Sequence, residues 1–298
     1  MGDKATPGAE RRPSERTAPR VVRTRAELRE VLAAAPRPLG LVPTMGALHE
    51  GHASLIRRAR DESATVLVTI FVNPRQFNET ADFEKYPRDK AADLRLAGSA
   101  GADLLWIPSV EDVYPAGFQT NVHVGRLTEP LEGAARPGHL EGVTTVVAIL
   151  LTLAGAEKAF FGQKDAQQLL VIRRMAGDLG MATEIVACPI VREADGLAMS
   201  SRNARLTPQE RAAAPVLRRA LLAARAEYDA GARDGAVLRA AMGDMLAAEP
   251  LATPEYVSCA DPATLRELAT IEGPALLSMA VRFGEVRLID NELLASGQ

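Results

Sequence analysis

Short hydrophobic runs recur along the first two thirds of the chain, separated by stretches in which apolar and polar residues alternate with helical spacing. The runs are Leu39–Val42, Ala64–Val72, Asp103–Ile107, Lys158–Phe161 and Glu184–Ile190. Ala64–Val72 is an uninterrupted series of β-branched and apolar residues, which is typical of a strand buried on both faces of a parallel sheet. We predict a strand at each run.

Helices are predicted between these strands. Thr24 and Glu27 have the spacing of a capping box, which starts a helix that runs to about Ala35. A helix is expected over residues 88–97, ended by Gly98 and Gly101. The remaining helices are expected over residues 51–60, 143–153 and 166–179. Because strands that alternate with helices form right-handed crossovers, the pattern predicts an α/β fold with a Rossmann-like, doubly wound parallel sheet.

The pattern changes after residue 190. Thr207, Pro208 and Glu210 are the residue types preferred at the N-cap, N1 and N3 positions of a helix, so a helix is expected to begin there. Alanine-rich helices follow to about Ala248. Three later segments have the character of strands: Tyr256–Cys259, Ala275–Phe283 and Val286–Ile289. We therefore expect a smaller C-terminal α+β domain.

These patterns divide the chain into a tail of residues 1–20, an N-terminal domain of residues 21–190 and a C-terminal domain of residues 191–298. The tail contains three prolines and no Leu, Ile, Val or Phe, so we expect it to be disordered and not a secretory signal. Residues 125–142 are rich in glycine and proline and are expected to form a surface loop.

Composition narrows the classes of function. The 298 residues carry a net charge of -3, which argues against a broad nucleic-acid surface. No run is long and apolar enough to cross a membrane, since Val143–Leu153 is too short. Cys188 and Cys259 lie far apart without C-x-x-C spacing, so we expect reduced thiols in a cytoplasmic protein and no zinc site.

The segment Pro43–His52 is the most informative part of the sequence. It follows a predicted strand, turns through Gly46 and opens a predicted helix at Gly51. Free backbone N–H groups and the helix dipole converge at such a turn, which suits the binding of phosphate. His49 and His52 add donors whose charge can change near neutral pH. The alternative is that the histidines only cap or pack the turn.

A second polar cluster follows the strand predicted at Lys158–Phe161. Gly162 ends that strand, and Lys164 and Asp165 stand at the start of the next helix. Ligands of open α/β sheets bind at this carboxyl edge. Lys164 could therefore neutralise a phosphate, whereas Asp165 could be only a first-turn helix acid. A solvated lysine is the alternative.

Three further segments carry polar groups in expected loops. Met199–Asn203 combines two serines with an arginine, which suits a flexible loop that closes over a polyphosphate; a polar linker is the alternative. Asn73–Phe77 follows the buried strand, and its amides could bind a hydroxyl or a carboxylate or merely cap a turn. Arg136–His139 offers two more polar groups on the expected surface loop.

Together these segments resemble the pantothenate synthetase (pantoate–β-alanine ligase) family, which belongs to the nucleotidyltransferase superfamily with HIGH-type and KMSKS-type motifs. The resemblance runs from about Val21 to Asn291. It rests on Pro-Thr-Met-Gly with Leu-His-x-Gly-His, Phe-Val-Asn-Pro-x-Gln-Phe, Phe-Gly-x-Lys-Asp-x-Gln-Gln and Met-Ser-Ser-Arg-Asn. Gln163 is a departure, because the family often has Glu there, and it removes a negative charge beside the expected phosphate site.

The resemblance implies a two-step reaction. The carboxylate of (R)-pantoate attacks the α-phosphate of ATP, which gives pantoyl adenylate and pyrophosphate. The amine of β-alanine then attacks the activated carbonyl, which gives pantothenate and AMP. The resemblance also implies Mg²⁺ on the ATP phosphates, without a dedicated metal site in the protein, and a homodimer.

Roles for individual residues follow from the same resemblance. His52 would hold the position of a proton donor, with His49 and Lys164 assisting on the phosphates. Gln76 and Gln168 would hold pantoate, with Gln76 also lying where β-alanine enters. The implied ATP site consists of Met45, Gly46, Ala47, Leu48, His49, Glu50, Gly51, His52, Gly162, Gln163, Lys164, Asp165, Val191, Met199, Ser200, Ser201 and Arg202. Residues 199–203 are the candidate lid that would keep the adenylate from water.

Two other functions are compatible with parts of this pattern. A nucleotidyltransferase of the same superfamily that acts on another small substrate would need no amine, and Gln76, Gln168 and the long C-terminal domain argue against it. A non-catalytic nucleotide-binding protein would not need both histidines, Lys164 and the two serines. An aminoacyl-tRNA synthetase is disfavoured because the chain has no basic excess and no anticodon-binding domain.

Overall fold

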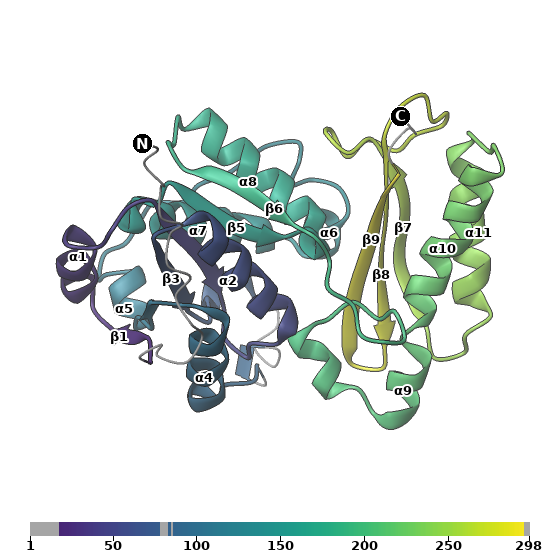
Figure 1. Cartoon of the computed structure of the whole chain (residues 1–298). Helices are drawn as coiled ribbons and strands as arrows, with labels where there is room; N and C mark the ends of the chain where they lie inside the picture. The colour runs from purple at the N-terminus through teal and green to yellow at the C-terminus, as the bar shows by residue number, and fades with distance from the viewer. Residues whose placement is uncertain (1–17, 78–82, 85, 295–298) are drawn as a thin grey trace, which may run out of the picture.

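The structure is a computed structural model that describes residues 18–77, 83–84 and 86–294. A 6-stranded parallel sheet has helices on both faces, and a 3-stranded antiparallel sheet lies beside it (Figure 1). The fold predicted from the sequence is confirmed. The predicted boundary between the domains at residues 190 and 191 stays a prediction.

The larger sheet has the strand order β1-β4-β3-β2-β5-β6. Its strands are β1 (Arg20–Val22), β2 (Leu39–Thr44), β3 (Thr65–Ile70), β4 (Leu104–Trp106), β5 (Lys158–Gly162) and β6 (Glu184–Cys188). The predicted strands are confirmed with small shifts at their ends, but β1 was missed. Arg20, assigned to the tail, pairs with Leu104 at the edge of the sheet. Residues 1–17 of the predicted tail lie outside the described residues.

Helices cover both faces of this sheet. The longer ones are α1 (Arg25–Ala33), α2 (Glu50–Glu62), α4 (Lys90–Ala100), α7 (His139–Ala154) and α8 (Ala166–Asp178), and shorter ones are α5 (Val110–Val113) and α6 (Glu132–Ala135). Alternate side chains of β2 serve two separate cores: Leu39 and Leu41 pack with α1, α7 and α8, whereas Val42 packs with α2 and α4. Burial on both faces explains why these strands are continuous apolar runs in the sequence.

Two predictions about the helices are wrong in part. Gly101, in the left-handed region, ends α4 as predicted, but Gly98 lies inside the helix. Residues 125–142 are a surface loop only in part: residues 125–131 and 136–138 form turns with exposed positions, but the segment also contains α6 and the start of α7, and Glu132 and His139 are buried. Glycine and proline in this segment mark tight turns of a packed element.

The C-terminal domain is a sheet with helices on its outer side (Figure 1). Its elements are α9 (Pro208–Ala213), α10 (Val216–Asp229), α11 (Gly235–Ala247), β7 (Thr253–Ala260), β8 (Ala275–Phe283) and β9 (Val286–Leu294). Thr207 and Glu210 form the expected capping box of α9. The apolar faces of α10, α11 and the sheet form one core, which confirms the α+β prediction.

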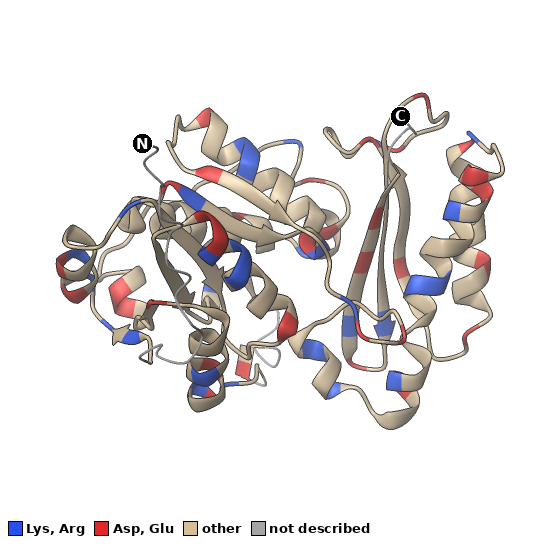
Figure 2. Ribbon diagram, in the orientation of Figure 1, with Lys and Arg blue, Asp and Glu red and all other residues tan. Residues whose placement is uncertain are grey.

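Acidic and basic residues are interspersed along the helices of both domains (Figure 2), in keeping with the net charge of -3. Within the described ranges, none of the helices combines the length and the apolar character needed to span a bilayer.

Candidate active site

A cavity of about 220 Å³ lies at the carboxyl ends of β2 and β5. These two strands are neighbours in the sheet, and the strand order reverses between them, which is where open α/β sheets bind ligands. The cavity is lined by the turns that follow β2, β3 and β5, by one face of α7, and by residues 189–191 and 199–202. Segments far apart in the sequence therefore meet at one place.

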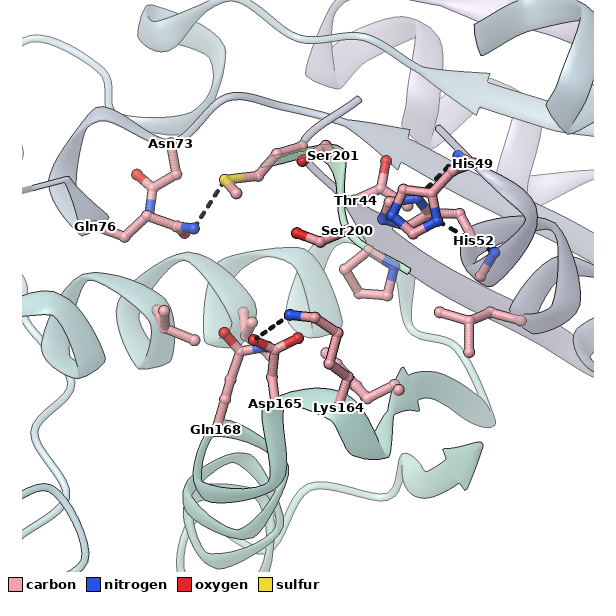
Figure 3. Close-up of a pocket in the computed structure, with 18 of the residues that line it drawn as sticks. Thr44, His49, His52, Asn73, Gln76, Lys164, Asp165, Gln168, Ser200 and Ser201 are labelled. Carbon is pink, nitrogen blue, oxygen red and sulfur yellow. Dashed lines mark hydrogen bonds and ion pairs between the residues drawn. The ribbon is translucent and has the colours of Figure 1, made fainter. Parts of the chain in front are cut away.

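Most of the predicted site residues line this cavity. They are Met45, His49, Gly51, His52, Gln76, Gly162, Lys164, Asp165, Gln168, Val191, Met199, Ser200, Ser201 and Arg202. In Figure 3, Gln76 and Gln168 lie toward one end, His49 and His52 toward the other, and Lys164 and Ser200 between them. Gly46, Ala47, Leu48, Glu50 and Gln163 are not among the lining residues.

The turn after β2 is held by a buried carboxylate. Gly46 and Ala47 both have positive φ, and the backbone N–H groups of Ala47 and Leu48 donate to Asp93 of α4 at 3.1 and 2.7 Å. These two N–H groups, which the sequence suggested for phosphate, thus bind within the protein. Glu50 forms an exposed ion pair with Arg57.

His49 and His52 cap the helix that they open. Nδ1 of His49 accepts a hydrogen bond from the backbone N–H of Gly51 at 3.2 Å, and Nδ1 of His52 accepts one from the backbone N–H of His49 at 3.3 Å. A backbone N–H can only donate, so each neutral imidazole carries its proton on Nε2. Both rings also line the cavity, with centroids 4.1 Å apart. Capping and contact with a ligand are therefore compatible.

Burial keeps both imidazoles neutral. It lowers the pKa of His49 to about 4, with a contribution from the positive charge of Lys164, and the pKa of His52 to about 3, with contributions from His49 and Lys164. The expectation that their charge changes near neutral pH is wrong, because burial beside a lysine disfavours further cations. The rings can donate hydrogen bonds without adding charge.

Lys164 and Asp165 lie in the 3₁₀ turn η3 (Gln163–Asp165) between β5 and α8. Lys164 Nζ is 4.0 Å from the Asp165 carboxylate, and the Lys164 side chain is 19% exposed. Asn291 of β9 holds this turn from the C-terminal domain, because its Nδ2 donates to the carbonyls of Gln163 and Lys164 at 3.0 and 2.8 Å. Lys164 is therefore not a solvated lysine: its side chain is largely buried, and Asn291 fixes the backbone that carries it.

Two adjacent glutamines in the first turn of α8 have different surroundings. Gln168 lines the cavity. Gln167 is buried, accepts from the backbone N–H of Glu132 at 2.9 Å and donates to the carbonyls of Leu127 and Pro130 at 2.8 and 2.9 Å. Gln167 thus holds the segment before α7 in place.

Hydrogen bonds from Asn73, Arg136 and His139 hold the turn that carries Gln76. Asn73 caps the 3₁₀ turn η2 (Pro74–Gln76), which favours the capping alternative for this residue. The backbone carbonyl of Gln76 accepts from Nδ1 of His139 at 2.7 Å and from Arg136 at 3.3 Å. A Cβ on Gly142 would lie 2.2 Å from the carbonyl oxygen of Arg75, so only glycine allows α7 to approach this turn so closely.

His139 is a third neutral imidazole of the site, and it is buried. Its Nε2 accepts from Arg136 at 3.0 Å, so Nδ1 carries the proton that is donated to Gln76. Burial and the charge of Arg136 lower its pKa to about 4. The sequence placed Arg136 and His139 on a loop but assigned them no role.

The Met199–Arg202 segment closes one side of the cavity. The backbone N–H of Met199 donates to the carbonyl of Val191 at 3.0 Å, and Ser200 caps the 3₁₀ turn η4 (Ser201–Arg205). Tyr86 OH lies 3.3 Å from Ser201 Oγ, which joins this segment to the N-terminal domain. Tyr86 and Thr44 line the cavity too, and sequence reasoning missed both. Thr44 stands within the Pro-Thr-Met-Gly motif; Tyr86 has no local signal.

Apolar side chains form the remaining wall. Val143, Val146, Val147 and Leu150 follow one another on one face of α7, and Phe71 lies beside them at the end of β3. The cavity is therefore polar where the turns meet and apolar along α7, a combination that suits a ligand with both a charged and an apolar part.

Sequence comparison identifies close relatives over nearly the whole chain. Residues 20–293 match the family model described as Pantoate-beta-alanine ligase. The pantothenate synthetase of Chloroflexus aggregans is 59% identical over 276 residues, which cover 92% of this chain and 99% of that protein. The pantothenate synthetase of Roseiflexus sp. is 56% identical over 275 residues, with the same coverage.

Solved structures agree with the sequence comparison. The crystal structure of pantothenate synthetase from Thermus thermophilus has a TM-score of 0.88 and 49% identity, and the match covers 92% of this chain and 98% of that one. The pantoate-beta-alanine ligase of Francisella tularensis, complexed with Beta-gamma ATP and Beta-alanine, has a TM-score of 0.75 and 32% identity, with coverage of 93% and 98%.

Proposed function

The chain belongs to the pantoate–β-alanine ligase family, and from this premise we propose that ATP, pantoate and β-alanine react in the cavity at the ends of β2 and β5. The reaction of the family is the ATP-dependent ligation of pantoate to β-alanine, EC 6.3.2.1. One observation carries the proposal. The polar residues that follow the adjacent strands β2 and β5 line the same cavity as Gln76 and Gln168.

In the first step the pantoate carboxylate attacks the α-phosphate of ATP, and pyrophosphate leaves. We assign Gln76 and Gln168 to pantoate, which places its carboxylate next to the phosphate end of the cavity. Negative charge spreads over the phosphate oxygens and the leaving pyrophosphate as the bond breaks. Donors and cations held in advance stabilise that charge more than they stabilise the ground state. The residues assigned to this task are His49, His52, Lys164, Ser200, Ser201 and Arg202.

In the second step the amine of β-alanine attacks the carbonyl of pantoyl adenylate, and AMP leaves. The adenylate is a reactive anhydride, so water must be kept away until the amine arrives. We assign this task to residues 199–203, whose serines line the cavity and whose Asn203 is anchored to the carboxylate of Glu193 at 2.9 Å. Gln76 lies where β-alanine would enter.

We propose that Mg²⁺ binds to the protein as a complex with ATP. The part of the chain that the structure describes contains no group of three or more His, Cys, Asp or Glu side chains that could hold a metal ion. Magnesium bound through phosphates keeps several waters and needs few protein ligands. We therefore propose that Mg²⁺ binds together with ATP, through its phosphates.

We further propose a homodimer in the cytoplasm. Both cysteines are buried and unpaired, which suits a reducing compartment. Light scattering coupled to gel filtration would show twice the mass of the 31.8 kDa chain; the mass of one chain would contradict the dimer.

A two-stage assay tests the reaction route. Pyrophosphate should exchange into ATP only when pantoate is added, and AMP should be released only after β-alanine follows. Exchange with other acids and not with pantoate would instead favour a nucleotidyltransferase that acts on another small substrate. Exchange that requires β-alanine would contradict a separate adenylate.

A further inference from the structure

The hydroxyl of Tyr114 lies at the end of a series of hydrogen bonds that leads into the cavity. Tyr114 OH donates to Oδ1 of Asn73 at 2.8 Å, and Nδ2 of Asn73 donates to Oε1 of Gln76 at 3.0 Å. Tyr114 does not line the cavity, whereas Asn73 and Gln76 do. The hydroxyl of Tyr114 is therefore linked to the cavity through these two amides, while its ring lies 6.1 Å from that of Phe71, a lining residue.

Backbone groups determine the direction of this series. The N–H of Arg75, which can only donate, contacts Oδ1 of Asn73 at 3.2 Å, and the carbonyl of Gly142, which can only accept, contacts Nδ2 at 3.0 Å. These contacts identify the oxygen and the nitrogen of the Asn73 amide. Tyr114 must then be the donor to that oxygen, and the Gln76 atom that faces Asn73 must be its oxygen.

The other end of the Gln76 amide is consequently a donor. Nε2 of Gln76 points to the sulfur of Met45 at 2.8 Å, shown by the dashed line in Figure 3. A thioether sulfur is a weak acceptor, so a carboxylate or hydroxyl oxygen replaces it at little cost. A reversed amide would present an oxygen at this point and would repel a carboxylate.

We propose that Tyr114 is a positioning residue: together with the Arg75 N–H and the Gly142 carbonyl it holds the Asn73 amide, and so keeps the amide nitrogen of Gln76 turned toward the oxygens of pantoate. The inference rests on the proposed function, in which pantoate lies at Gln76. The Tyr114 ring is held in place by Phe118, with centroids 5.0 Å apart, and by Arg75, whose guanidinium lies 5.4 Å from the ring centroid. Burial raises the pKa of Tyr114 to about 12, so its hydroxyl remains a donor at any pH the enzyme meets.

The substitution Tyr114→Phe removes only the hydroxyl. We expect the KM for pantoate to rise about 3- to 10-fold, the effect of one lost neutral hydrogen bond, while the KM for ATP and kcat change less than about twofold. KM does not depend on the fraction of folded enzyme, so partial unfolding does not mimic this result. An unchanged KM for pantoate, or equal rises for pantoate and ATP, would overturn the inference.

Tyr86→Phe is the matched control for Tyr114→Phe, because it removes a hydroxyl at the end of the cavity assigned to the ATP phosphates. It removes a hydroxyl that lies 3.3 Å from Ser201 Oγ, so we expect it to change the KM for ATP more than the KM for pantoate. If Tyr86→Phe and Tyr114→Phe instead raise the KM for pantoate alike, the Tyr114 effect is not specific to Gln76 and the inference fails.

The Gln76→Ala background distinguishes this inference from the proposed function. With the Gln76 amide removed, adding Tyr114→Phe should no longer change the KM for pantoate. If it still raises KM by the same factor, Tyr114 acts through general packing and the inference alone is wrong. If Gln76→Ala itself leaves the KM for pantoate unchanged, the proposed pantoate site is wrong and the inference falls with it.

Discussion

Arg287 of β9 and Glu132 of α6 join the two domains through two parallel hydrogen bonds. Nη1 and Nη2 of Arg287 donate to the two carboxylate oxygens at 2.8 and 2.7 Å, and Tyr256 OH donates to the same carboxylate at 2.8 Å. The side chains of Arg287 and Glu132 are only 13% and 9% exposed. A bidentate pair restricts orientation as well as distance, so the contact holds the C-terminal sheet against the segment that carries Arg136 and His139.

The substitution Glu132→Gln should destabilise the folded chain. It keeps the shape of the side chain but removes the charge that faces Arg287, which keeps its ion pair with Glu255. Removal of one member of a buried ion pair costs about 3 kcal/mol or more of unfolding free energy. Urea unfolding measures the loss. Asp178→Asn, which breaks the exposed pair with Arg174, should cost less than about 1 kcal/mol, and equal losses in the two variants would contradict the importance of burial.

Stability should fall as the pH drops below 6.5. The folded-state pKa values of His49, His52 and His139 lie at about 4, 3 and 4, below the ordinary value of 6.5, so the unfolded chain binds protons that the folded chain does not. Each histidine should lower the unfolding free energy by roughly 1 kcal/mol per pH unit until its folded-state pKa is reached. Unfolding in urea at pH 8, 6.5 and 5 tests this, and equal stability at pH 6.5 and pH 5 would refute it.

A separate loss is expected at lower pH from Glu132. Burial acts to raise the pKa of this carboxyl, but the hydrogen bonds and charge of Arg287 outweigh burial and hold it below the ordinary value of 4.5. A carboxyl with a lowered pKa contributes stability that is present above pH 4.5 and disappears as the pH falls through the folded-state pKa. In Glu132→Gln the unfolding free energy should therefore depend less on pH below pH 4.5, while its pH dependence between pH 6.5 and 5 should stay unchanged. A change between pH 6.5 and 5 would contradict the assignment of that range to the histidines.

Lys164→Ala should slow adenylate formation by roughly 10²- to 10⁴-fold, since it removes a cation held beside the phosphates. Pyrophosphate exchange in the presence of pantoate measures this step. Lys90→Ala, at the exposed start of α4, provides the control for loss of a lysine and should retain full activity. An exchange rate for Lys164→Ala within threefold of the parent would remove this lysine from the phosphate site.

His52→Ala should also reduce adenylate formation by roughly 10²- to 10⁴-fold, because it removes a buried N–H donor and the acceptor of the His49 backbone N–H. His123→Ala, which alters an exposed histidine paired with Glu141, should have no effect. Since both site imidazoles are neutral well below pH 6, they should produce no inflection in the exchange rate between pH 6 and 8. An inflection that disappears in His52→Ala would show that its pKa is much higher.

The larger sheet could be predicted because its strands are buried on both faces and are therefore continuous apolar runs, as in Thr65–Ile70. Residues 125–142 could not, because their order depends on partners far away in the chain. Gln167 holds this segment through three backbone groups, and Tyr256 and Arg287 reach it from the C-terminal sheet. Local composition contains none of these contacts.

The cavity was predictable to the extent that its residues directly follow strands. Gln76 and Lys164 stand just beyond β3 and β5, so parallel strands bring them to one edge. Arg136 and His139 reach the same place through the carbonyl of Gln76, a contact between segments distant in sequence. The neutral state of His49 and His52 also escaped prediction, since burial sets it and residue type does not.

The hydrogen bonds from Asn291 to the turn that carries Lys164 affect how the site forms while the chain is being synthesised. The described residues that line the cavity have all been translated once Arg202 is made, but the side chain that anchors the backbone of Gln163 and Lys164 belongs to β9, much later in the chain. A nascent chain that ends before β9 would carry all the groups of the cavity and yet lack the anchor of its lysine. Synthesis of β9 would thus precede a fully formed phosphate site, so chains that stop before β9 would be poor competitors for ATP.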